Sequence, residues 1–80
     1  MKTYKIRLNT IDLVKSFSNL IHKDNIHADL HCGSYSVDAQ SILGILTLNL
    51  TSDLDLVVRS YMNNEEIEEF EKSLQPYIVE

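Results

Sequence analysis

The stretch VDAQSILGILTLNL, residues 37–50, contains the end of a strand, a serine and a short apolar segment. Val37 and Ala39 alternate with polar residues, which is typical of a strand with one buried face. Ser41 stands directly before the apolar segment, where its side chain can cap the first turn of a helix. We therefore predict a strand that ends near Ala39 and a short, very apolar helix that begins after Ser41.

Strand and helix patterns alternate along the rest of the chain. Apolar residues at every second position predict strands over residues 4–8, 26–32, 35–39 and 54–58, with a tight turn at Gly33-Ser34. Helical spacing of apolar residues predicts a first helix capped by Asn9 or Thr10, and a last helix capped by Asn63 or Asn64, which Pro76 ends or loosens. The order β-α-β-β-α-β-α indicates an α+β fold with four mostly antiparallel strands and three helices on one face.

Composition sets the class of protein. Eighty residues form one domain, residues 1–80, and 44% hydrophobic with 24% charged residues is typical of a soluble globular protein. No apolar run approaches the roughly 18 residues that a membrane helix needs, and no signal peptide is recognised. Cys32 is the one cysteine, so no internal disulfide can form, which fits a reducing compartment. We expect a cytoplasmic protein without a membrane partner.

The charge distribution bears on the partners. The net charge is −5, which argues against nucleic acid, because neutralising phosphates requires clustered Lys and Arg. Five of the seven cations lie in the first 23 residues, and five glutamates lie within residues 65–71. Either these are two solvated faces of opposite sign, or the first strand and helix form a basic docking edge.

Residues 28–50 resemble the corresponding segment of HPr, the small phosphocarrier of the bacterial sugar phosphotransferase system. The resemblance lies in Ala28-x-Leu30, Gly33 and the run from Val37 to Leu48, which is similar to the family's V-N-x-K-S-I-M-G-x-M-x-L. In element order the resemblance extends over essentially the whole chain. It implies an HPr-like open-faced two-layer β-sandwich, a bacterial origin and a protein that is not itself an enzyme.

The chain departs from the family at the site of phosphate transfer. The family's phosphate-carrying histidine follows the first strand in the signature G-I-H-A-R-P-A, whereas this chain has LNTIDL at residues 8–13. His22 is predicted at the far end of the first helix, and His27 and His31 are separated by roughly 13 Å of strand, too far to share one metal ion. No nucleophile–base pair or glycine-rich phosphate loop is recognised. We predict no catalytic residue, no metal and no cofactor.

The serine segment keeps the family's pattern. By resemblance, Ser41 is the position that a dedicated kinase phosphorylates as a regulatory mark. A helix N-terminus suits a phosphate, but capping alone, contributing about 1 kcal/mol, already explains a serine there, and Asp38 nearby would repel an added phosphate.

The apolar helix has more large side chains than one buried stripe can hold. Ile42, Ile45 and Leu48 are expected to complete the core. Leu43 and Leu46 match family positions that dock partners, and they either form a contact surface here or join the core. Our leading hypothesis is a non-catalytic binding or regulatory module that docks a protein partner through residues 41–46. The alternatives are a regulator switched by phosphorylation of Ser41, and a structural domain that self-associates through the apolar helix.

Overall fold

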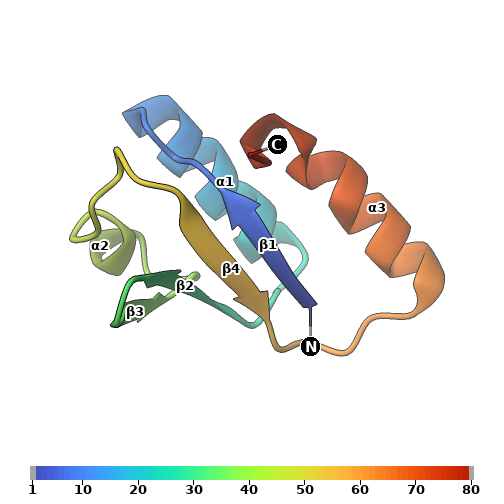
Figure 1. Ribbon diagram of the computed structural model, residues 1–80. Coiled ribbons are helices and arrows are strands. Elements are labelled where there is room, and N and C mark those ends of the chain that lie inside the picture. The colour runs from blue at the N-terminus through green and yellow to red at the C-terminus, as the bar shows by residue number, and fades with distance from the viewer. Residues whose placement is uncertain (1, 80) are drawn as a thin grey trace.

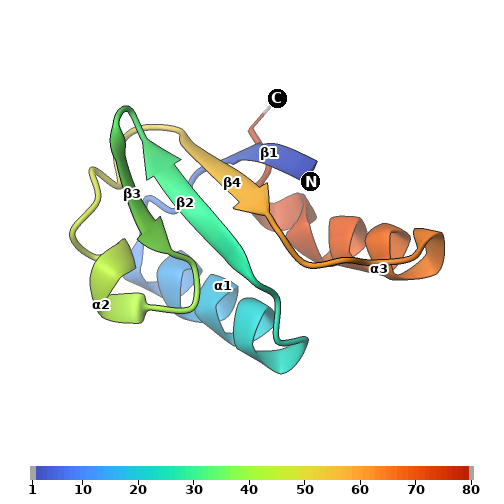
Figure 2. The ribbon, with the colours of Figure 1, turned by 90° about the horizontal axis from the view of Figure 1, so that it is seen from below.

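The computed structural model describes residues 2–79, and within them four strands form one antiparallel sheet. The strands are β1 (Lys2–Ile6), β2 (Ala28–Cys32), β3 (Tyr35–Asp38) and β4 (Leu54–Val58), in the spatial order β1-β4-β2-β3. The helices α1 (Ile11–Lys23), α2 (Ile42–Ile45) and α3 (Asn64–Leu74) lie on one face of this sheet (Figures 1 and 2). The predicted element order and α+β class are confirmed.

The register of the sheet separates a buried face from a polar one. One row of paired residues faces the helices: Tyr4, Leu56, Leu30 and Val37. The next row faces solvent: Lys5, Asp55, His31 and Ser36. Successive strand residues point to opposite faces, so the alternation in the sequence becomes this division. Ion pairs on the outer face join Lys5 to Asp55 over 3.6 Å and Arg59 to Asp29 over 3.0 Å.

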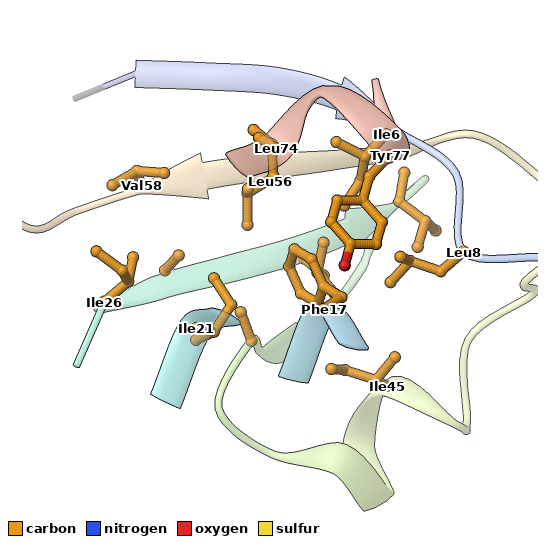
Figure 3. Packing of buried hydrophobic residues seen from close by; sticks show 14 of the residues in the cluster. Ile6, Leu8, Phe17, Ile21, Ile26, Ile45, Leu56, Val58, Leu74 and Tyr77 are labelled. Atoms are coloured by element: carbon orange, nitrogen blue, oxygen red, sulfur yellow. The ribbon is translucent and has the colours of Figure 1, made fainter. Parts of the chain in front are cut away.

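The core lies between the sheet and the helices (Figure 3). Phe17 of α1 meets Tyr77 edge to face, with ring centroids 5.5 Å apart, and Ile45 faces this pair from α2 (Figure 3). Each predicted element contributes side chains that are fully buried or nearly so: Ile6, Leu8, Val14, Phe17, Ile21, Ile26, Ala28, Leu30, Ala39, Ile45, Leu48, Leu54, Leu56, Val58, Phe70, Leu74 and Tyr77. Cys32 is half-buried against this cluster.

The structure identifies the caps of the two long helices. Thr10 caps α1, because its Oγ1 accepts a hydrogen bond from the backbone N–H of Leu13 over 3.1 Å. Asn63 caps α3 in a reciprocal arrangement, in which its Oδ1 accepts from the Glu66 N–H and the Glu66 carboxylate accepts from the Asn63 N–H. Both caps are among the alternatives that the sequence indicates.

The ends of three strands differ from the prediction by one or two residues: β1 spans Lys2–Ile6, β2 begins at Ala28 and β3 ends at Asp38. Leu8 stays fully buried beyond β1. The C-terminal segment lies beside the end of β1, where Arg7 N–H donates to Tyr77 O and Val79 N–H donates to Lys5 O. Past Leu74, residues Gln75–Tyr77 form a 3-10 turn that contains Pro76, in agreement with a proline that ends or loosens the last helix.

Candidate functional site

The candidate site is α2 together with its capping serine. Ser41 is exposed, has an extended backbone, and its Oγ accepts a hydrogen bond from the N–H of Gly44 over 3.1 Å. The preceding residue is fixed as well, since the N–H of Gln40 donates to Oδ1 of Asp38 over 2.8 Å. The hydroxyl of Ser41 therefore lies at the positive end of a single helical turn, with one carboxylate nearby in the chain.

Gly44 lets α2 pack closely against β3. A Cβ at this position would lie 3.1 Å from the Ser41 Oγ and 3.2 Å from the Cβ of Val37. Both contacts are tighter than ordinary van der Waals distance, and the second involves a β-branched residue of a strand that cannot easily move. Because Gly44 has no Cβ, its N–H can donate to Ser41 while α2 stays in close contact with the sheet.

The exposure of the α2 side chains follows their direction around the helix. Ile45 is fully buried and marks the core side. With about 100° per residue, Ile42, Leu46 and Leu43 point about 60°, 100° and 160° away from Ile45. Their exposed fractions rise in the same order, from 39% through 43% to 76%. Ile42, Leu43 and Leu46 form one exposed apolar surface, which we call the α2 surface.

The expected core role of Ile42 is wrong, while Ile45 and Leu48 are buried as expected. A helix of four residues makes little more than one turn, so one side chain faces the core fully, and Ile45 takes that position. Leu43 and Leu46 lie on the exposed side of the helix.

The segment that contains α2 has polar but no charged side chains of its own, and Asp38 lies just before it. Residues 39–52 contain no acidic or basic residue. The Tyr35 hydroxyl lies 3.3 Å from Thr47 Oγ1, which itself donates to the Gly44 carbonyl over 2.6 Å. At the start of α2, Nε2 of His22 donates to the Gln40 carbonyl over 2.8 Å, which joins the end of α1 to the loop before Ser41. An exposed apolar surface flanked by polar side chains suits contact with another protein surface.

The β1–α1 junction, where the family has its histidine, is built differently. Thr10 supplies the cap, the side chain of Ile11 is 56% exposed, and the carboxylate of Asp12 lies in the first turn of α1. The chain's three histidines lie elsewhere: His22 near the end of α1, His27 before β2 and His31 on the outer face of the sheet. An acidic group at the positive end of α1 neutralises a charge that would otherwise attract an anion.

In the part of the chain that the structure describes, no group of three or more His, Cys, Asp or Glu side chains lies close enough together to hold a metal ion. Asp29, which the sequence places between His27 and His31, is engaged by Arg59. Within residues 2–79, no helix has the length and apolarity needed to span a membrane.

In its fold, this chain is similar to a protein of known structure. No protein-family model matches the sequence, and no curated protein matches it. The fold is similar to the crystal structure of HPr-C-His from Thermoanaerobacter tengcongensis, with a TM-score of 0.70 and 22% sequence identity. The match covers 95% of this chain and 89% of that chain. The chain therefore has the HPr fold.

Proposed function

We propose that this chain is a non-catalytic binding or regulatory module of the HPr fold, which docks a protein partner through the α2 surface. One observation carries the proposal. Within residues 2–79, six large hydrophobic side chains are exposed, and three of them (Ile42, Leu43 and Leu46) belong to the single turn of α2 and its C-cap. Exposed apolar side chains gathered in one patch mark contact sites.

The proposal includes the loss of phosphate transfer. Residues 8–13 offer neither an imidazole nor a cation, the guanidinium of Arg7 just before them is paired with Asp53, and Asp12 would repel a phosphate at the start of α1. The resemblance to HPr favours a protein of the phosphotransferase system, or a regulator connected with it, as the partner in a bacterial cytoplasm. In this role the chain binds and is not itself an enzyme.

The docking role is tested by affinity capture with matched variants. The Leu43→Asp/Leu46→Asp variant places two charges on the α2 surface, and Thr3→Asp/Ser36→Asp places two at exposed residues on the outer face of the sheet. We expect the wild type and Thr3→Asp/Ser36→Asp to retain the same partner, and Leu43→Asp/Leu46→Asp to bind the purified partner at least about tenfold more weakly. Circular dichroism checks that all three chains fold. Binding of Leu43→Asp/Leu46→Asp as tight as that of the wild type contradicts the proposal.

The loss of phosphate transfer is tested directly. The chain is incubated with Enzyme I and its phosphate donor, with a histidine-containing HPr as the positive control. We expect acid-labile phosphate on the control and none on this chain. Acid-labile phosphate on His22, His27 or His31 would overturn this part of the proposal.

A second function is favoured by the position of Ser41. Its hydroxyl is exposed and lies at the N-terminus of α2, where a phosphate could accept hydrogen bonds from backbone N–H groups. Phosphorylation by an HPr-type kinase would add negative charge beside the α2 surface and so weaken apolar docking there. Intact-mass measurement after incubation with kinase and ATP tests this role. A mass gain in the wild type that is lost in Ser41→Ala supports it, and no gain contradicts it.

A further inference from the structure

A groove of about 390 Å³ lies away from α2, between the end of α1 and α3. Its lining comes from residues 20–26, from residues 60–62 of the β4–α3 connection, and from one side of α3. These segments meet because α1 ends and α3 begins toward the same end of the sheet, where β4 finishes (Figure 1). Nothing in the proposed function uses this groove.

The base of the groove is apolar and its rim is acidic. Ile26 and Phe70 are buried, so they lie at the base, and Leu20 and Met62 are half-buried beside them. The exposed charged residues of the lining are Asp24, Glu66 and Glu69, against the single cation Lys23.

The carboxylates of the rim form no ion pair within residues 2–79. The ion pairs within residues 2–79 engage Asp29, Asp53, Asp55 and Glu71, and none of the three acids of the rim. Glu66 accepts a backbone hydrogen bond as part of the α3 cap, which leaves its charge in place.

A second groove, of about 270 Å³ and also lined by residues 60–62, has basic and no acidic residues in its lining. Its cations are already neutralised, because Lys2 lies 3.6 Å from Glu71 and Arg59 lies 3.0 Å from Asp29. Uncompensated negative charge therefore belongs to the first groove.

Tyr61 stands at the boundary of both grooves with 92% of its surface exposed. Its neighbours are fixed: the Oγ of Ser60 accepts from the N–H of His27 over 2.7 Å, Met62 packs against the core, and Asn63 caps α3. An exposed aromatic ring on a held backbone loses little conformational entropy when it binds, and tyrosine is enriched among residues that dominate binding energies.

We infer that this groove docks a cationic, amphipathic segment of another protein. Lys or Arg side chains of that segment face Asp24, Glu66 and Glu69, and one apolar side chain enters between Leu20 and Met62. Tyr61 covers the bound segment and can stack on an arginine. The negative charge of the rim favours a positively charged segment, and the small apolar base favours a segment that also carries an apolar side chain. This inference is independent of the α2 surface.

The test is a titration of the ¹⁵N-labelled chain, followed by NMR, with two probes: a short amphipathic leucine–lysine peptide and its leucine–glutamate counterpart. We expect the lysine peptide to shift the amides of Leu20, Asn25 and Met62 in a saturable way, with affinity that falls as salt is raised. The glutamate peptide should cause no shift. Absence of saturable binding by the lysine peptide, or shifts centred on α2, overturns the inference.

Two matched charge-reversal variants distinguish docking in the groove from nonspecific electrostatic attraction to the acidic chain. Asp24→Lys/Glu69→Lys changes two residues of the rim, whereas Glu65→Lys/Glu68→Lys makes the same change of charge at exposed residues outside the lining. We expect the first variant to bind the lysine peptide about tenfold more weakly, and the second to stay within about twofold of the wild type. Tyr61→Ala should also cost about tenfold. Equal losses in the two double variants would overturn the inference.

Discussion

α1 and α2 begin with the same hydrogen bond but are held in place differently. Thr10 and Ser41 each accept a bond from the N–H three residues later, and both distances are 3.1 Å. α1 then continues for 13 residues and buries an apolar stripe, whereas α2 lasts four residues and buries Ile45. A short helix gains little from propagation, so α2 depends on its cap and on one packed side chain. The α2 side chains that lie outside that contact are exposed and available to a partner.

The two helix starts also differ in charge. α1 has Asp12 in its first turn, and α2 has no acidic residue there. A carboxylate stabilises the positive end of a helix, but it also occupies the place where an anion would be attracted. The first turn of α2 itself carries no such carboxylate, although Asp38 lies just before Ser41.

The largest expected effect comes from removing the packed residue of α2. Ile45→Ala removes a fully buried side chain beside Phe17 and should lower the free energy of unfolding by about 3 kcal/mol. Leu43→Ala, on the exposed side of the same turn, should change it by less than about 0.5 kcal/mol. Urea unfolding measures both. Similar losses in the two variants would show that α2 does not have the two sides described here.

The next largest effect is expected for Gly44→Ala, and the sign of its change in the free energy of unfolding is the test. Helix propensity alone would make Gly44→Ala stabilising by up to about 1 kcal/mol. The added Cβ would press on Val37 Cβ and Ser41 Oγ, so we expect a loss of about 1 to 3 kcal/mol. The loss should shrink when Ser41 is already alanine, because one of the two close contacts is then gone. Stabilisation by Gly44→Ala would contradict the close packing of α2 on β3.

Some of these features could be predicted from the sequence, and others depend on tertiary contacts. Alternation in the strands predicted that Leu30 and Leu56 are buried, because a strand has only two faces. The direction of Ile42 could not be predicted, because one helical turn is too short for a periodic pattern to show which side is buried. The high exposure of Tyr61 could not be predicted, because Tyr61 lies in a connection without periodicity, and the groove beside it joins segments far apart in the chain.

Removing the two caps sharpens the comparison between the helices. Thr10→Ala and Ser41→Ala each lose one capping hydrogen bond, worth about 1 kcal/mol. For Thr10→Ala the loss should appear in the global free energy of unfolding, because α1 is part of the core. For Ser41→Ala it should appear mainly as faster hydrogen exchange at Gly44 and Ile45, because α2 can open locally. A purely global effect of Ser41→Ala would mean that α2 unfolds only with the whole domain.

α3 extends the comparison, because a polar contact to the sheet helps to hold it. The hydroxyl of Tyr4 donates to Glu71 Oε2 over 2.8 Å, and the ring of Tyr4 meets Phe70 edge to face. Burial of the ring, followed by the hydrogen bond and the nearby charge of Glu71, raises the pKa of Tyr4 above its ordinary value of about 10. The fold thus favours the neutral phenol.

This raised pKa gives the smallest of the expected effects, and its sign follows from proton linkage. Below about pH 10 Tyr4 is neutral in both folded and unfolded chains, and its contact with Glu71 contributes fully to stability. Above about pH 10 the unfolded chain loses the proton first, so this contribution falls as the pH rises. Tyr4→Phe lacks the ionising group, so the difference in free energy of unfolding between wild type and Tyr4→Phe should shift against the wild type above about pH 10. Urea unfolding of both proteins between about pH 9 and 11 measures that difference, and a constant difference across this range would mean that the phenol of Tyr4 does not help to hold α3 on the sheet.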